Sequence, residues 1–141
     1  MTAPPVLTDR QLLERTWGGG PRVADVLATT DHKVIGKRYL VTAAVFFLIA
    51  GIESLVMRTQ LASSNLKVVD PDLYDQLFSM HGITMVFLFA TPMLAGFGNY
   101  LVPIQIGSRD MAFPRLNALS YWVYLAAGIF MYLDSAQAMR T

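Results

Sequence analysis

Three long stretches of this chain carry almost no charge, and they limit the folds that it can adopt. Between Tyr39 and Met57 the only charged residue is Glu53, and the ranges 77–108 and 116–133 contain no Asp, Glu, Lys or Arg. Uncharged apolar runs of about 18 or more residues are typical of transmembrane helices, because that length crosses the hydrocarbon layer. The sequence therefore predicts an all-α integral membrane protein. Its three transmembrane helices are expected over residues 34–57, 77–106 and 116–133.

The first 30 residues differ from the rest of the chain. Pro4, Pro5 and the run from Gly18 to Pro21 interrupt helices, and no apolar core of a signal peptide is present. We expect a flexible tail over 1–30, with one short helix near 9–15, ahead of a membrane part over 31–141. The formal net charge of +1 gives no indication of nucleic-acid binding, and the absence of cysteine excludes a disulfide framework.

The positions of Lys and Arg predict how the three helices are oriented. Six of these residues lie before the apolar run that begins at Tyr39, and the short connection 107–115 contains two. The connection 58–76 balances two positive residues with three acids. Because Lys and Arg concentrate in cytoplasmic segments, the N-terminal tail and the second connection are expected in the cytoplasm. The first connection and the last residues are expected outside.

His81 is a candidate functional residue, because it lies inside the second predicted span, about one turn from its outer end. An ionisable side chain within a membrane is costly and marks function by default. No acid lies within a turn of His81 to pair with it. A neutral imidazole here suits a metal or haem iron, and Gly82 leaves room for a flat macrocycle. The alternative is a histidine that only hydrogen-bonds a neighbouring helix, and spacing alone does not separate the two.

Four further polar residues are candidates. Asn99 lies 18 residues after His81, which is five turns of an ideal helix, so both are expected on one face. Asp110 lies in the second connection and Asn117 begins the third span. An acid and two amides at one end of a bundle could order waters that carry protons, although helix-joining amides and a solvated acid are the simpler interpretations. Arg58 ends the first span, either as an interface anchor or as a donor to a cofactor at the depth of His81.

These residues belong to a series of short motifs. In chain order the motifs are Thr30–Gly36, Met57–Leu61, Tyr74, Met80–Gly82, Gly96–Asn99, Gly107–Asn117 and Ser120–Trp122. The series closely resembles the start of subunit I of haem-copper oxidases of the cytochrome c oxidase type, over about residues 29–122, and Gly107–Asn117 is its most specific part. The resemblance implies that these helices begin a twelve-helix membrane bundle.

The resemblance also implies a role for each candidate. His81 matches one of the two axial ligands of a low-spin haem, haem A in most such oxidases, and Arg58 matches the arginine that hydrogen-bonds its formyl group. Asp110 matches the acid at the mouth of a proton channel, and Asn99 and Asn117 match the asparagines just inside it. The implied activity is reduction of oxygen to water with proton pumping. Cytochrome c would donate electrons, subunits II and III would be partners, and the location would be a prokaryotic plasma membrane.

The resemblance further predicts that much of the subunit is missing. The chain has only two histidines, His32 and His81, so the high-spin haem, copper B and the second low-spin ligand are expected in a missing part. The 141-residue chain alone is therefore expected to be inactive. Gln60 stands where mitochondrial relatives have a Glu that helps to hold a structural cation, so no such metal is expected here.

Two alternatives stay open. The motifs Gly107–Asp110 and Tyr74–Gln76 also suit a quinol oxidase. The positions of its quinone site correspond here to Ile49, Glu53, Leu73 and Gln76, so the Arg and His of that site are absent. The second alternative is a non-catalytic membrane remnant or assembly scaffold.

Overall fold

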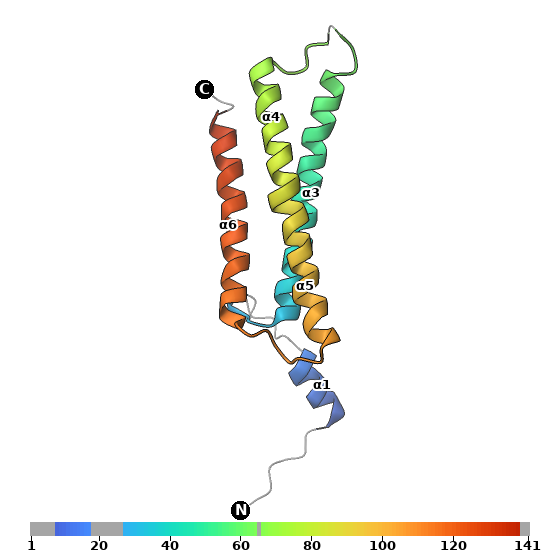
Figure 1. The fold of residues 1–141 in the computed structure, drawn as a ribbon, viewed down its shortest axis with the longest axis vertical. Coiled ribbons are helices and arrows are strands. Elements are labelled where there is room, and N and C mark those ends of the chain that lie inside the picture. Colours follow the sequence, from blue (N-terminus) through green and yellow to red (C-terminus); the bar gives the residue numbers. More distant parts are fainter. Residues whose placement is uncertain (1–7, 18–26, 65, 139–141) are drawn as a thin grey trace, which may run out of the picture.

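A computed structural model describes residues 8–17, 27–64 and 66–138, and this part of the chain is helical with no strand. Its elements are α1 (Asp9–Trp17), α3 (His32–Gln60), α4 (Pro71–Ile83), η1 (Thr84–Ala90), α5 (Thr91–Gln105) and α6 (Pro114–Ala138). Because α4, η1 and α5 follow one another without a break, they form one long rod beside α3 and α6 (Figure 1). All three rods are long and apolar enough to cross a membrane, which confirms the predicted all-α membrane fold.

Apart from the end of the second rod at Gln105, the helix ends lie further out than the hydrophobic pattern predicted. Asp31 caps α3 by accepting a hydrogen bond from the backbone N–H of Lys33 at 2.9 Å, and Asp70 caps α4 through the N–H of Leu73 at 2.8 Å. Such caps start a helix before its apolar residues begin. The third helix was expected to end at 133, but α6 continues to Ala138, since polar residues also form helix outside a membrane. Most of the predicted tail 1–30 lies outside the described residues, and its short predicted helix is confirmed as α1.

The second rod contains a π-helical segment, η1, directly before Pro92. A proline inside a helix typically kinks it, because proline lacks the N–H that in a regular helix would bond the carbonyl four residues earlier, here that of Leu88. The chain instead widens over seven residues, and the hydroxyl of Tyr124 on α6 donates to the Leu88 carbonyl at 2.8 Å. The hydrogen bond that proline removes is thus supplied by a neighbouring helix, as membrane helices require.

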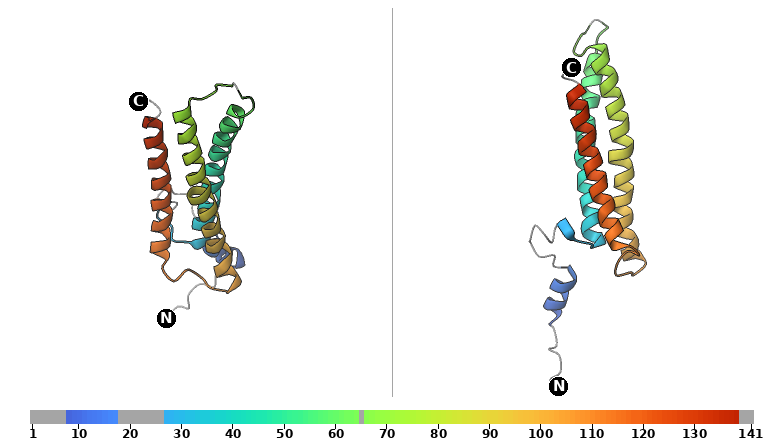
Figure 2. Two further views of the ribbon diagram at one scale, coloured as in Figure 1. Left: turned by 45° about the horizontal axis from the view of Figure 1, so that its top comes forward. Right: turned by 90° about the vertical axis from the view of Figure 1, so that its left-hand side faces the viewer.

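Small residues allow α3 and α5 to approach closely. A Cβ atom on Gly36 would lie 3.0 Å from both the carbonyl oxygen of Gly96 and the backbone nitrogen of Tyr100. The helices α3 and α6 are joined instead by side-chain hydrogen bonds, of which Tyr39 to Ser120 is one, at 2.9 Å. Figure 2 shows the resulting arrangement, with α3 and the α4–η1–α5 rod side by side and α6 along them.

Replacing Gly36 by alanine is expected to destabilise the bundle. The new methyl group meets backbone atoms, which cannot move individually, and such overpacking costs about 1–3 kcal/mol. Gly51 on the same helix is the matched control, because a Cβ there meets nothing within 4 Å. Thermal unfolding of the purified membrane protein would compare Gly36→Ala with Gly51→Ala. Equal melting temperatures for the two variants would contradict the close contact.

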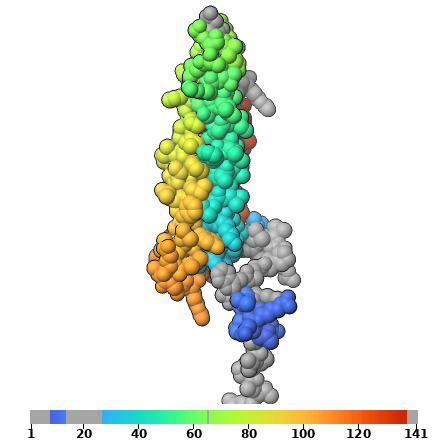
Figure 3. All heavy atoms as spheres, turned by 90° about the vertical axis from the view of Figure 1, so that its right-hand side faces the viewer, coloured from blue at the N-terminus to red at the C-terminus, as the bar shows by residue number. Residues whose placement is uncertain are grey.

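The outer surface of the bundle is strongly apolar. Large hydrophobic side chains are exposed along every rod, among them Leu48, Leu55, Leu94, Val123 and Phe130. Figure 3 shows the elongated shape, with α1 lying beyond the end of the bundle at which α3 begins. Lipid or further helices must cover these faces in the working protein.

Candidate functional site

His81 lies near the end of α4, half-buried against α3. Its Nδ1 atom is 3.0 Å from the carbonyl oxygen of Ala50. A carbonyl can only accept, so Nδ1 carries the proton and the lone pair of the neutral ring lies on Nε2. Metal-binding histidines are typically oriented in this way, with one ring N–H held by a carbonyl or carboxylate. A Cβ on the adjacent Gly82 would meet nothing within 4 Å, so the surroundings of His81 fit an axial haem ligand.

A buried polar chain lies beside this histidine, and its members Tyr132 and Thr84 were not among the predicted site residues. Tyr132 on α6 donates to the Oε1 atom of Glu53 on α3 at 3.1 Å, and its oxygen is 2.7 Å from the hydroxyl of Thr84. Glu53 is only 8% exposed, and among the described residues its Oε2 atom has no hydrogen-bond partner. Glu53 follows Ala50 by one helical turn, so the chain joins three helices at the level of His81.

We had expected Arg58 to lie at the same depth as His81, and the structure differs from this expectation. It is in the last turn of α3, eight residues beyond the Ala50 carbonyl that His81 contacts, which corresponds to roughly 12 Å along a helix. Its side chain is exposed. The structure therefore places Arg58 nearer the loop 61–70 than His81, and it does not bring the two side chains into contact.

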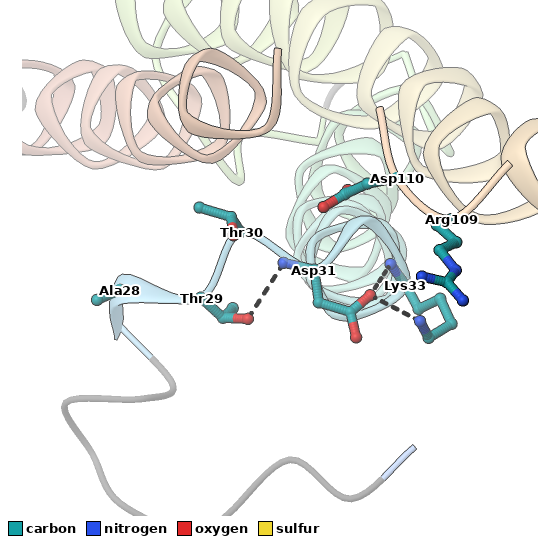
Figure 4. Close-up of a pocket in the computed structure, with 7 residues that line it drawn as sticks. All are labelled: Ala28, Thr29, Thr30, Asp31, Lys33, Arg109 and Asp110. Carbon is teal, nitrogen blue, oxygen red and sulfur yellow. Dashed lines mark hydrogen bonds and ion pairs between the residues drawn. The ribbon is translucent and has the colours of Figure 1, made fainter. Parts of the chain in front are cut away.

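A polar cavity of about 470 Å³ lies at the opposite end of the bundle, where α3 begins and the α5–α6 connection passes. It is lined by Ala28, Thr29, Thr30, Asp31, Lys33, Arg109 and Asp110. Figure 4 shows Arg109 and Asp110 facing the start of α3, where Asp31 is paired with Lys33 at 3.1 Å. The predicted site residue Asp110 is thus brought together with the segment 28–33, which had been noted only as part of a motif.

The two asparagines lie near this cavity but do not line it. Asn99 is 7% exposed, and its backbone carbonyl oxygen is 2.9 Å from Nδ1 of His32, the residue between Asp31 and Lys33. The side-chain Nδ2 of Asn117 is buried and, within the part of the chain that the structure describes, has no acceptor. Neither predicted amide lines the cavity with Asp110.

These features define a class of protein: a membrane-embedded helical segment with a histidine oriented for metal ligation towards one end and a polar cavity at the other. The chain belongs to the family of cytochrome c and quinol oxidase polypeptide I, whose family model matches residues 34–140. The predicted resemblance to subunit I of the haem-copper oxidases is confirmed.

Individual relatives give the same result. The chain is 52% identical over 117 residues to a putative cytochrome c oxidase subunit 1-beta of Streptomyces avermitilis, covering 83% of this chain and 21% of that protein. It is 53% identical over 102 residues to cytochrome c oxidase subunit 1 of Thermostichus vulcanus, covering 72% and 18%. A haem-copper oxidase subunit I+III of Aeropyrum pernix is 50% identical over 105 residues, covering 74% and 13%. The chain therefore spans about a fifth of the length of its first relatives.

Proposed function

We propose that this chain is part of subunit I of a terminal respiratory oxidase, in which it ligates a low-spin haem through His81. The observation that carries the proposal is the hydrogen bond from Nδ1 to the Ala50 carbonyl at 3.0 Å, since it leaves Nε2 directed away from its own helix partner and available to iron. Bound there, haem A would store and pass on one electron. Arg58 would donate hydrogen bonds to the formyl group of the haem and so tune its potential.

The polar end of the bundle is proposed as the inner mouth of a proton path. Asp110 opens into the polar cavity, and Asn117 and Asn99 would hold waters beyond it. Nδ2 of Asn117 has no acceptor among the residues that the structure describes. This supports the role, because a buried donor without a protein partner is usually satisfied by water. With the cytoplasmic orientation of the N-terminus that Lys and Arg predict, the path would take up protons from the cytoplasm across a prokaryotic plasma membrane.

The whole oxidase would reduce oxygen to water and pump protons, with subunits II and III as partners and lipid around the exposed apolar faces. The high-spin haem and copper B would be held by residues beyond this chain. Cytochrome c is the proposed electron donor, in agreement with the names of the relatives.

Quinol is the second candidate donor, because of two buried acceptors. Among the described residues, Oε2 of Glu53 and Oε1 of Gln76 have no hydrogen-bond partner, and both stand at positions that correspond to a quinone site. The other two positions are the apolar Ile49 and Leu73, which weakens this candidate.

Oxygen consumption by the purified native oxidase tests the proposed function. Reduced cytochrome c and a soluble quinol are supplied separately, and we expect turnover with cytochrome c at least tenfold above that with quinol. The reverse preference would favour the quinol oxidase. Absence of both haem and turnover in the native protein would favour a membrane remnant or scaffold.

A further inference from the structure

The second rod contains two prolines, and each leaves one backbone carbonyl without its helical partner. In a regular helix the N–H of residue i bonds the carbonyl of residue i−4, and proline has no N–H. In a regular helix, the N–H that Pro92 lacks would bond the carbonyl of Leu88, and the one that Pro103 lacks would bond the carbonyl of Asn99. A side chain from another helix takes each of them: Tyr124 donates to Leu88 at 2.8 Å, and His32 contacts Asn99 at 2.9 Å.

The contact with His32 is well defined. His32 is the first residue of α3 and only 2% exposed. Because a carbonyl oxygen only accepts, Nδ1 of His32 must carry the proton and donate it. The bond joins residues 67 positions apart, so it fastens the beginning of the first rod to the last turns of the second. A buried carbonyl without this donor would be destabilising.

The backbone of this turn controls where the Asn99 side chain lies. Asn99 is buried, and in the described ranges its amide makes no hydrogen bond that would fix it independently. His32, which contacts Asn99, belongs to the segment 28–33, whose other residues line the cavity with Asp110. The position of the Asn99 amide relative to that cavity therefore depends on the backbone bond to His32.

We propose that His32 is a positioning residue for the proton path: by donating to the carbonyl that Pro103 frees, it fixes Asn99 relative to the Asp110 cavity. The geometric part of this inference stands alone, and its functional part rests on the proposed proton uptake. His32 acts through its hydrogen bond and needs no change of its charge.

The test uses variants of the full-length oxidase purified with its haems. His32→Ala removes the donor and is expected to lower oxygen turnover by roughly tenfold, the order expected for a lost buried hydrogen bond, while the low-spin haem spectrum is unchanged. His32→Asn keeps an N–H donor close to the position of Nδ1 and is expected to restore at least half of the turnover.

The same substitution in a Pro103→Ala variant tests whether the Asn99 carbonyl is the cause of the lost turnover. Pro103→Ala returns the backbone N–H to position 103, which can then bond the Asn99 carbonyl within the helix. In this background the loss of turnover caused by His32→Ala should shrink to less than about threefold, which is the non-additivity expected of groups that share one partner. An equal loss in both backgrounds would overturn the inference.

The other possible outcomes distinguish failure of this inference from failure of the proposed proton path. If His32→Ala lowers the melting temperature but leaves turnover per haem unchanged, His32 is only structural and the inference fails. If Asp110→Asn slows turnover while His32→Ala does not, this inference fails and the proposed proton path stands. If neither variant affects turnover, the proposed proton path itself fails.

Discussion

Replacing His81 by alanine is expected to abolish the low-spin haem signal of the purified full-length oxidase. The imidazole is the side chain whose ring is oriented by the Ala50 carbonyl, with Nε2 left for the iron. Alanine offers no lone pair, and removing even an outer partner of a metal ligand costs 10–100-fold. Turnover with any electron donor should therefore fall by more than about 100-fold. Optical spectra of the reduced protein and extracted-haem quantification would measure the loss.

A control separates loss of the ligand from damage to the helix. Phe78 lies three residues earlier on α4 and is 65% exposed, so Phe78→Ala also removes a ring from this helix without removing the proposed ligand. It should retain the low-spin band. Retention of that band in His81→Ala would show that another residue ligates the iron, and loss in both variants would point to unfolding of α4.

Asp110→Asn is expected to give the second largest effect, on proton uptake alone. Asparagine keeps the oxygen that accepts the N–H of Met111 at 2.9 Å, so the connection should keep its shape, but the amide cannot exchange a proton. Loss of a positioned proton carrier costs roughly a hundredfold or more. Steady-state oxygen turnover and stopped-flow proton uptake should fall by that order, whereas the haem spectrum should be unchanged.

Asp134→Asn is the matched control for this variant. Asp134 is also exposed, but it lies near the far end of α6, and its replacement should leave turnover within about twofold of wild type, as surface substitutions usually do. Normal proton uptake in Asp110→Asn would remove Asp110 from the path. Equal losses in both variants would indicate a general effect of surface charge.

The sequence was sufficient for features that depend on neighbouring residues. The three spans followed from the uncharged runs. The helix ends were less accurate, because capping by Asp70 and the polar last turn of α6 do not alter the hydrophobic pattern. The π-helical segment was missed as well, since a single proline permits a kink, a bulge or a break.

Contacts between residues that are far apart in the sequence could not be predicted from it. Nothing in the sequence pairs His32 with the carbonyl of Asn99, or Glu53 with Tyr132, which lies 79 residues away. The predicted depth of Arg58 relative to His81 also differed from the structure, because relative depth depends on how far one rod is shifted along the other. The resemblance assigned roles to single residues, whereas the hydrogen bonds that orient them required the folded helices.

The close contact between Gly36 and Gly96 has a consequence for how the protein is made. The two residues are sixty positions apart. They meet near the end of the bundle opposite the loop 61–70, which links α3 to the α4–η1–α5 rod. The first two rods thus form a helical hairpin whose close backbone contact lies at the end away from its connecting loop. During synthesis α3 therefore cannot make this contact until nearly all of the α4–η1–α5 rod has left the ribosome and entered the bilayer beside it.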